Sequence, residues 1–525
     1  LGRLAPDQRA AATAPPGPVL CIAPAGSGKS TTLVARIAWL VASGVRPDGI
    51  RAITFNRRAA LELASRLDQA LAALGWAAGS VRVQTFHALG LEIVRDAGGR
   101  VATLVDRVTM LGQILPRASP AEVAVLDTQI SRLKVDHGVS AADVAADPEP
   151  GPLGRIFVEY QAYLTEAGAA DFDDLILGAI AALEADPACL ARWRRACGHL
   201  LVDEVQDVDR AQLRLALLLT APGNRLFLVG DDDQSIYGWR LADVRRVLTL
   251  ERELADLRLV ALVTNYRCPR PVVVRANRLI GHNRERFPKT IRAGPDAAGR
   301  LVLAPDGSDD DDRIRAALAS WPADGGSRAV LARTNQELLP AAAVAVEQGI
   351  PFQAAQLELP LDDPAVAGLL AALEGAAQAE PDVAPLVLLA SLKEPWRTDT
   401  PLLRTMIGWA PRFRDVATFA RAIRHHQARA ATLRQGPAQL TLATAHGTKG
   451  LEFDHVIVLQ DADRFPSRRA LDEAADPVRA LEEERRLAYV AWTRARRSLT
   501  LVYDPEAPSM FLREAFSPAE RSPGR

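Results

Sequence analysis

The stretch from Ala23 to Thr31 reads Ala-Pro-Ala-Gly-Ser-Gly-Lys-Ser-Thr and combines glycines with a lysine and several hydroxyl side chains. Gly26 and Gly28 allow backbone N–H groups to close around a polyphosphate. Lys29 is expected to reach the β- and γ-phosphates, and the Ser30 hydroxyl to complete the shell of a Mg²⁺ ion. The predicted phosphate-binding residues are Ala25, Gly26, Ser27, Gly28, Lys29, Ser30 and Thr31.

The elements around this loop favour the same interpretation. The apolar run 19–22 precedes it and is typical of a buried strand, while the apolar spacing of residues 33–40 predicts a helix. A strand, a glycine-rich turn and a helix form the context in which phosphate loops occur. Ala23 stands where the general pattern has its first glycine, and a chance glycine turn is the alternative interpretation.

A second chemical signal is the apolar run 199–202 followed by Asp203 and Glu204. In phosphate-loop ATPases a strand that ends this way supplies a carboxylate for Mg²⁺ and a general base. Asp203 is expected to hold the metal, and Glu204 to polarise the attacking water. The alternative is an acidic helix start after a strand, which is common.

Further strands end in polar or aromatic residues. Residues 225–229 precede a loop in which Gln234 can sense the γ-phosphate, while Tyr237 and Trp239 beside Arg240 offer planar faces for bases. This loop either packs inward or forms a nucleic-acid platform, and we favour the platform. Phe55, beside two arginines, is a core residue or a second stacking face. Thr85 and His87 end a third strand.

Gln8 lies in a short predicted helix just upstream of the phosphate loop. An amide in that place can pair with the edge of adenine, as amides do elsewhere. Taken alone, an ordinary surface residue is the more common explanation for Gln8.

Length and composition place bounds on the protein. A chain of 525 residues predicts three or four domains. The net charge of −1 argues against binding nucleic acid by bulk charge alone, so any such site must be local. Four cysteines without a Cys-x-x-Cys pair disfavour a zinc, iron–sulfur or disulfide framework. Without a signal segment or a long apolar stretch, a soluble cytoplasmic protein is expected, with no membrane partner.

The order of elements predicts an α/β fold. Alternating strands and helices favour parallel sheets with ligands at the carboxyl ends of the strands. Helical patterns interrupt this order between residues 90 and 170, and again between 357 and 435. The acidic cluster at 171–174 could hold a metal but favours a helix cap with a solvated face. The tail from Ser517 is expected to be disordered.

Taken in order, these segments resemble the UvrD/Rep group of superfamily 1 helicases. The motifs that carry the resemblance are Val-Asp-Glu-x-Gln-Asp, Gly-Asp-x-x-Gln-Ser-Ile-Tyr-x-Trp-Arg, Asn-Tyr-Arg, Lys-Gly-Leu-Glu-Phe and Glu-Glu-Arg-Arg-Leu-x-Tyr-Val-Ala-x-Thr-Arg-Ala. The resemblance extends from Leu4 to about Leu512 and implies two RecA-like P-loop motor domains with parallel sheets, each carrying a mainly helical insert. The implied divisions are a first motor domain (1–89 and 175–261) with a helical insert (90–174), a second motor domain (262–356 and 437–512) with a reduced insert (357–436), and a polar tail (513–525).

The resemblance also implies roles for individual residues. ATP binding would add Gln8 and Tyr266 on adenine and Glu452 on the ribose to the loop residues. Catalysis would involve Lys29, Asp203, Glu204 and Gln234, with Arg267 and Arg494 as arginine fingers from the second motor domain. Nucleic-acid contacts would come from Phe55, Thr85, His87, Tyr237, Trp239 and Arg240. Ser30 and Asp203 would hold Mg²⁺.

The implied function is an ATP-dependent 3′–5′ DNA helicase or translocase that acts on single-stranded or tailed duplex DNA in repair or recombination, with a possible protein partner. Leu241 replaces a usual glycine, and Asn56-Arg57 replaces a usual Thr-Asn. The reduced insert leaves open a translocase that does not unwind duplex, and a non-catalytic subunit of a larger complex is a third hypothesis. A nuclease domain is not expected in this chain.

Overall fold

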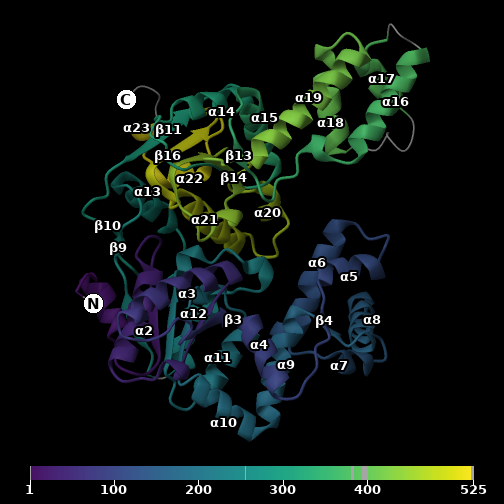
Figure 1. Cartoon of the computed structure of the whole chain (residues 1–525). Coiled ribbons are helices and arrows are strands. Elements are labelled where there is room, and N and C mark those ends of the chain that lie inside the picture. Colours follow the sequence, from purple (N-terminus) through teal and green to yellow (C-terminus); the bar gives the residue numbers. More distant parts are fainter. Residues whose placement is uncertain (1, 255, 380–382, 393–399, 522–525) are drawn as a thin grey trace. The chain divides into compact units, whose positions relative to one another are not determined.

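The computed structural model describes residues 2–254, 256–379, 383–392 and 400–521. Contacts between residues divide the chain into two compact units. Unit 1 comprises Leu1–Arg267 and Ile280–Asp296, and unit 2 comprises Cys268–Leu279 and Ala297–Arg525. Figure 1 labels many of the helices and strands of both units.

Unit 1 is built on a six-stranded sheet in the order β3-β2-β6-β7-β1-β8. Every neighbouring pair in this sheet is parallel. Parallel sheets are covered on both faces, which explains why β1, β6 and β7 are buried along their whole length and, apart from His199 in β6, apolar. The strands are β1 (Val19–Ile22), β2 (Ile50–Thr54), β3 (Arg82–Thr85), β6 (His199–Val202), β7 (Leu226–Gly230) and β8 (Arg258–Ala261).

Two apolar cores lie on opposite faces of this sheet. Val19 and Cys21 pack with Leu33 and Ile37 of α2, whereas Leu20 and Ile22 pack with residues of α4, α9 and α11. The alternation along β1 is the period-2 pattern of a strand. The helices are α1 (Pro6–Ala12), α2 (Lys29–Ala42), α3 (Arg57–Ala72), α4 (Phe86–Asp96), α9 (Phe172–Ala185), α10 (Pro187–Ala196), α11 (Arg210–Thr220) and α12 (Val244–Leu248).

The segment between α4 and α9 is mainly helical and has its own small core around Leu111, Phe157 and Tyr160. Its two short strands form a separate parallel pair. The elements are β4 (Thr103–Leu104), α5 (Arg107–Ile114), α6 (Pro120–Ser131), a π-helical turn (Arg132–Asp136), α7 (Ala141–Ala145), α8 (Pro152–Glu166) and β5 (Ala169–Ala170).

Unit 2 contains a second six-stranded parallel sheet, in the order β11-β16-β15-β12-β14-β13. The prediction of an α/β fold with a parallel sheet in each of two motor domains is therefore confirmed. The strands are β11 (Arg300–Pro305), β12 (Arg328–Ala332), β13 (Phe352–Gln353), β14 (Leu440–Thr444), β15 (Phe453–Leu459) and β16 (Ala495–Tyr503). The helices around them are α13 (Arg270–Ile280), α14 (Asp310–Ala319), α15 (Leu339–Gln348), α20 (Arg468–Asp472), α21 (Pro477–Trp492) and α22 (Met510–Ala515).

Between β13 and β14 the described residues form four α-helices with a core of their own, which includes Leu369, Met406 and Phe419. The side-chain amide of Gln427, in the last of these helices, donates to the carbonyl of Leu361 (2.6 Å), which precedes the first of them. The helices are α16 (Ala365–Ala379), α17 (Pro385–Ser391), α18 (Pro401–Trp409) and α19 (Val416–Gln435).

The two units divide after Arg267, and the chain returns from unit 2 to unit 1 over Ile280–Asp296. The predicted domain boundaries stay predictions. The tail is not disordered over its described part, because α23 (Pro518–Arg521) is helical and Glu520 pairs with Arg275 and Arg278. Residues 522–525 lie outside the described residues.

No helix within the described ranges combines the length and apolarity needed to cross a bilayer. The cysteines, Cys21, Cys189, Cys197 and Cys268, are all buried and free. Among the described residues, no cluster of three or more His, Cys, Asp or Glu side chains is arranged to hold a metal ion by itself.

Candidate nucleotide and nucleic-acid site of unit 1

Several predicted site residues of unit 1 follow the carboxyl ends of strands and lie at one edge of the sheet. The loop 23–28 follows β1, Asp231 follows β7, Asp203 follows β6 and Phe55 follows β2. These four strands are adjacent in the sheet, and all run in the same direction. The parallel order therefore gathers residues that are far apart in the sequence.

The loop 23–28 turns sharply into α2. Gly26 and Gly28 have positive φ angles of 67° and 84°, which glycine adopts without a steric penalty. A Cβ at Gly26 would lie 2.7 Å from the side chains of Asn265 and Arg267. Both glycines are therefore required by the backbone, and α2 begins at Lys29 with its N-terminus toward the loop.

Gln8 is buried against this loop, with 7% of its surface exposed. Its Nε2 donates to the carbonyl of Ser27 (2.9 Å), and a Cβ at Gly28 would lie 2.6 Å from the same nitrogen. The alternative that Gln8 is an ordinary surface residue is therefore wrong. Its predicted contact with adenine stays a prediction.

Lys29 and the two carboxylates after β6 form the polar centre of the edge. Nζ of Lys29 lies 3.8 Å from Oε1 of Glu204 and 3.4 Å from the carbonyl of Ala23. Burial and the neighbouring Glu204 raise the pKa of Asp203 to about 7. A carboxylate that is costly to ionise without a cation and the hydroxyl of Ser30, in the first turn of α2, are donor types that suit Mg²⁺.

Glu204 has a left-handed backbone with φ of 52°, which is rare for a residue with a side chain. Such a conformation persists only where the surroundings hold it. Here Gln206 contributes, because its Nε2 donates to Oε2 of Glu204 (2.6 Å). Sequence reasoning missed Gln206 as a site residue, although it is the glutamine of the Val-Asp-Glu-x-Gln-Asp motif.

Gln234 lies in the loop after β7, buried and donating through Nε2 to Oδ2 of Asp231 (2.6 Å). Asp231, Asp232 and Asp233 are all paired with Lys289, whose side chain is 1% exposed. Lys289 comes from the segment that returns to unit 1. No local sequence signal marks this lysine as a partner of the Gln234 loop.

The aromatic residues predicted to stack on bases come together. The rings of Phe55 and Tyr237 are stacked, with centroids 5.0 Å apart and planes inclined by 12°. Trp239 packs edge-on to Tyr237 at 6.2 Å and carries Arg240 over its ring at 4.6 Å. Trp239 is 53% exposed, so the loop does not pack inward at this residue.

Leu241, which replaces a usual glycine, adopts a φ of 63°. Left-handed backbone costs a residue with a Cβ roughly 1–2 kcal/mol. The Leu241 side chain is buried in the core of unit 1, which offsets part of that cost. The departure from glycine thus retains the turn and adds an apolar contact.

Thr85 and His87 lie at the start of α4. The Thr85 hydroxyl caps this helix by accepting from the N–H of Ala88 (3.2 Å), and His87 packs edge-on to Phe172 at 5.1 Å. Burial lowers the pKa of His87. A cavity of about 620 Å³ lies between the helical segment and the sheet edge of unit 1. Phe55, His87, Trp239 and Arg240 are among the residues that line it.

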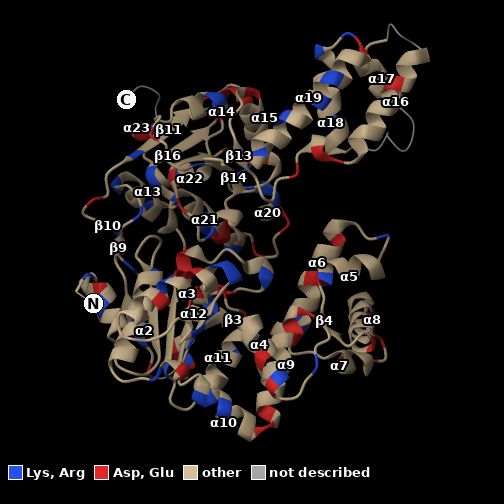
Figure 2. Cartoon of the chain, in the orientation of Figure 1, with Lys and Arg blue, Asp and Glu red and all other residues tan. Residues whose placement is uncertain are grey.

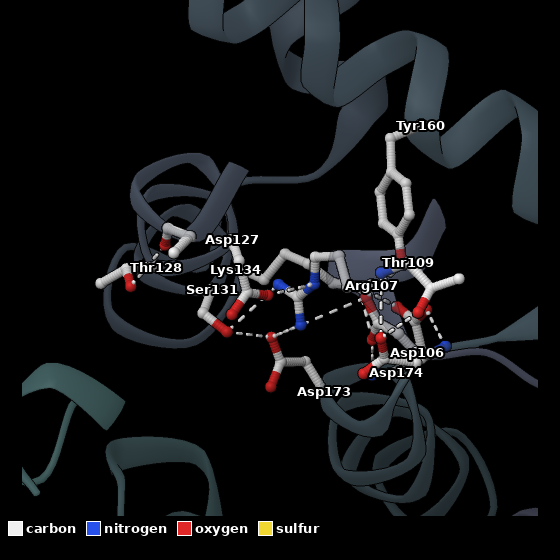
Figure 3. A network of polar contacts seen from close by, with 12 residues as sticks. Asp106, Arg107, Thr109, Asp127, Thr128, Ser131, Lys134, Tyr160, Asp173 and Asp174 are labelled. Atoms are coloured by element: carbon white, nitrogen blue, oxygen red, sulfur yellow. Dashed lines mark hydrogen bonds and ion pairs between the residues drawn. The ribbon is translucent and has the colours of Figure 1, made fainter. Parts of the chain in front are cut away.

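The acidic cluster at the start of α9 is a helix cap, as predicted, because Asp171 accepts from the N–H of Asp174 (2.9 Å). The predicted solvated face is wrong. Asp171 is buried and pairs with Lys134 (2.8 Å), while Asp173 pairs with Arg107 (2.6 Å). Figure 3 shows the Arg107 and Asp173 side chains turned toward each other. The cluster fastens the helical segment to the sheet domain.

Tyr266 and Arg267 belong to unit 1 by their contacts. The N–H of Tyr266 donates to the carbonyl of Gly26 (2.8 Å), and the Tyr266 ring is 49% exposed. The N–H of Arg267 donates to Oδ1 of Asn265 (2.9 Å). The strand pair β9 (Thr264–Asn265) and β10 (Arg292–Ala293) holds this region against the phosphate loop.

The remaining predicted residues lie in unit 2. Arg494 is buried, and its guanidinium donates to the carbonyls of Val490 (2.8 Å) and Leu451 (3.1 Å). Glu452, which follows Leu451, pairs with Arg496 at 3.5 Å. Unit 2 therefore places the predicted arginine finger beside the predicted ribose contact. Their roles stay predictions.

Basic and acidic residues are interspersed over the ribbons of both units (Figure 2), as the net charge of −1 implies. Any attraction for a polyanion must then come from local features such as Arg240 and the residues Arg57 and Arg58 at the start of α3.

Comparison with known proteins gives matches to two family models. The UvrD/REP helicase N-terminal domain matches residues 4–255, and the UvrD-like helicase C-terminal domain matches residues 412–506. The chain is 31% identical to the ATP-dependent DNA helicase UvrD2 of Mycobacterium tuberculosis, an alignment that covers 94% of this chain and 78% of that protein.

Other relatives match over shorter stretches. The chain is 33% identical to ATP-dependent DNA helicase UvrD1 of Mycobacterium tuberculosis over 67% of this chain and 50% of that protein. It is 32% identical to ATP-dependent DNA helicase PcrA of Staphylococcus aureus over 55% of this chain and 42% of that protein. The matched stretch thus spans about half the length of these two relatives.

Proposed function

The chain belongs to the UvrD/REP helicase family, and on that premise we propose that it is a DNA-dependent ATPase motor that moves along single-stranded DNA. The observation that carries the proposal is the shared sheet edge of unit 1. It holds the phosphate loop and the Asp203-Glu204 pair next to the stacked rings of Phe55 and Tyr237. Nucleotide chemistry and base stacking can therefore influence one another through a single rigid sheet.

The phosphate loop binds the nucleotide in this proposal. Backbone N–H groups between Gly26 and Ser30 surround the phosphates, and Lys29 turns from Glu204 to the β- and γ-phosphates. Gln8 and Tyr266 each donate a hydrogen bond to a carbonyl of the phosphate loop, and in this proposal both contact adenine. Thr31 follows Ser30 in the first turn of α2.

The carboxylates divide the chemistry between them. Ser30 and Asp203 hold Mg²⁺, which neutralises phosphate charge when it is bound. Glu204 accepts a proton from the water that attacks the γ-phosphate, and Gln234 orients the groups around it. Arg267 and Arg494 neutralise the charge that develops on the transferred phosphate.

Single-stranded DNA lies over the aromatic residues at the same edge. Bases stack on Phe55, Tyr237 and Trp239, while Arg240 contacts phosphate. His87 lines the cavity beside them, and Thr85, the N-cap of α4 two residues before it, completes the proposed path. In this proposal Phe55, Tyr237 and Trp239 alternate their grip on the strand as ATP is bound and hydrolysed.

The direction of movement is proposed as 3′ to 5′, which the resemblance implies, with a role in repair or recombination and a possible protein partner. The test uses oligonucleotides with a streptavidin block at either end, followed by a tailed duplex. ATP-dependent removal of streptavidin from the 5′ end alone supports the direction, and removal from the 3′ end alone contradicts it. A translocase without unwinding would displace streptavidin but leave the duplex intact.

A further inference from the structure

Gln206 joins two loops of the candidate site through the two ends of its amide. Its Nε2 donates to Oε2 of Glu204 (2.6 Å), and its Oε1 accepts from the N–H of Asp231 (2.9 Å). The residue is 1% exposed. A methyl group at Gly230 would overlap Oε1, so the glycine at the end of β7 leaves room for this amide. The contact is therefore built into the fold.

Asp231 extends the connection to Gln234. Its backbone N–H is bound by Gln206, while its Oδ2 accepts from Nε2 of Gln234 (2.6 Å). The hydroxyl of Ser235 donates to the backbone carbonyl of Gln206 (3.3 Å) and closes the loop from the other side. A continuous set of hydrogen bonds thus runs from the proposed general base to the proposed γ-phosphate sensor.

Lys289 forms an ion pair with Asp231, the residue that links Gln206 to Gln234. Its ammonium lies 3.0 Å from Oδ1 of Asp231 and 2.9 Å from Oδ2 of Asp233, and it also pairs with Asp232. Three adjacent buried carboxylates repel one another unless a cation lies between them. Arg286 adds a second pair to Asp233 (2.7 Å). The loop that carries Gln234 therefore depends on the segment 280–296 for its charge balance.

The same segment contacts the support of the phosphate loop. The N–H of Gly294 donates to the carbonyl of Asn265 (2.8 Å), one residue before the Tyr266 whose N–H binds Gly26. The chain enters the segment from unit 2 and leaves it into unit 2. Residues 280–296 are thus joined at both ends to the second unit while holding two parts of the candidate site.

We propose that Gln206 and Lys289 are positioning residues for ATP hydrolysis. Gln206 fixes the orientation of the Glu204 carboxylate. Lys289 fixes the position of Asp231, which in turn binds Gln206 through its N–H and Gln234 through its carboxylate. The inference rests on the proposed function. Neither side chain contacts the nucleotide in this account, so their loss slows turnover and leaves nucleotide affinity unchanged. The alternative is a purely structural role, in which loss of either residue lowers stability without a specific effect on turnover.

The first test is Gln206→Asn, which keeps the amide but is one methylene too short to reach Glu204 and the N–H of Asp231 together. We expect kcat to fall roughly 10-fold and KM for ATP to stay within about 2-fold. The matched control is Gln84→Asn, because Gln84 is also buried and also bridges a donor and a glutamate in unit 1, accepting from Arg82 (3.0 Å) and donating to Glu92 (3.2 Å). Equal kcat values for the two variants would overturn the role of Gln206.

A double variant separates positioning from general damage. If Gln206 acts through Glu204, adding Gln206→Asn to Glu204→Gln lowers single-turnover hydrolysis no further. An additional loss equal to that of Gln206→Asn alone would mean that the two residues act independently, and would contradict the proposal. Absence of DNA-stimulated hydrolysis in the wild-type chain would overturn the proposed function and this inference together, whereas an active wild type with an unaffected Gln206→Asn overturns only the inference.

The second test is Lys289→Arg, which keeps the positive charge but spreads it over a planar group that cannot lie between three carboxylates in the same way. We expect a roughly 10-fold lower kcat with KM for ATP within about 2-fold. Lys134→Arg is the matched control, since Lys134 is also buried and pairs with Asp171 and Asp174 outside the site. A wild-type kcat in Lys289→Arg would contradict the role of Lys289. This comparison decides the proposal by itself if Gln206→Asn does not fold.

Discussion

Phe55 and Tyr237 lie face to face, with ring centroids 5.0 Å apart and planes inclined by only 12°, although they follow different strands of the sheet in unit 1. Offset stacking of two aromatic rings stabilises both loops and leaves outer faces for further stacking. Because β2 and β7 are separated in the sheet only by β6, the pair spans the strand that ends at Asp203 and Glu204. The stacked pair therefore flanks the strand that carries Asp203 and Glu204 of the proposed hydrolytic centre.

Replacing Phe55 by alanine is expected to weaken binding of an oligo-dT strand by about 1–3 kcal/mol, the range typical of one lost base stack. ATP affinity without DNA is expected to stay unchanged. Fluorescence anisotropy of a labelled oligonucleotide measures the first, and a fluorescent ATP analogue measures the second. Trp76→Ala removes another exposed aromatic of unit 1 as a control, and an equal loss of DNA binding in that variant would contradict the assignment.

Replacing Glu204 by glutamine keeps the shape of the side chain and removes the proton acceptor. Hydrolysis is expected to fall roughly 10²–10⁴-fold, while the affinities for ATP and single-stranded DNA stay within about 2-fold of the wild type. A quenched-flow measurement of single-turnover hydrolysis gives the rate. Turnover at the wild-type rate would remove Glu204 from the role of general base.

The buried ion pairs around the residues of Figure 3 are expected to stabilise the helical segment between α4 and α9. Although burial raises the pKa of Asp171, Lys134 and Arg107 lower it to about 2, so the carboxylate is charged at neutral pH. Asp171→Ala leaves two buried cations without this partner and is expected to cost about 3–5 kcal/mol. Thermal unfolding followed by circular dichroism measures the loss. Asp143→Ala removes an exposed carboxylate of α7 that accepts from the N–H of the N-cap residue Ser140, and it is expected to change stability far less. Equal losses in the two variants would contradict the role of burial.

Stability is expected to fall in mild acid because of His199 and His446. Burial lowers the pKa of each to about 4, so the folded state stays neutral where the unfolded chain, with a pKa near 6.5, takes up a proton. This contribution is complete above about pH 6.5 and is lost as the pH falls toward 4. We expect about 1–2 kcal/mol per histidine, after allowance for solvent screening.

Denaturant unfolding of His199→Gln at pH 7.5 and pH 5.0 checks this expectation. The variant should lose less stability between the two pH values than the wild type. His425→Gln, at an exposed position of α19, should follow the wild-type curve. Identical pH dependence in all three proteins would exclude His199 as a source of the acid sensitivity.

Much of the architecture could be predicted from local patterns. Continuous apolar runs such as residues 19–22 and 200–202 are typical of strands buried on both faces. The residues that follow these runs mark the carboxyl edge of a parallel sheet. The glycines of the phosphate loop have the positive φ angles that their type permits. These features depend on short-range chemistry, which a single sequence contains.

Long-range pairing could not be predicted in the same way. The sequence around Lys289 is polar and carries no sign that its ammonium is buried among three aspartates from a distant loop. The aspartates at the start of α9 have the composition of a solvated face. In the structure Asp171 pairs with Lys134 and Asp173 pairs with Arg107 instead. Pairing of β9 with β10 joins residues 264–265 to the distant residues 292–293, and no local pattern indicates this contact.

The most direct test of the central claim is ATP hydrolysis by the purified chain with and without single-stranded DNA, with Lys29→Ala as the blank. The account predicts hydrolysis that is strongly stimulated by DNA and is lost in the blank, because Lys29 is the cation of the phosphate loop. Hydrolysis that is absent with and without DNA, or that survives in Lys29→Ala, would contradict the assignment of unit 1 as the catalytic centre of a DNA-dependent motor.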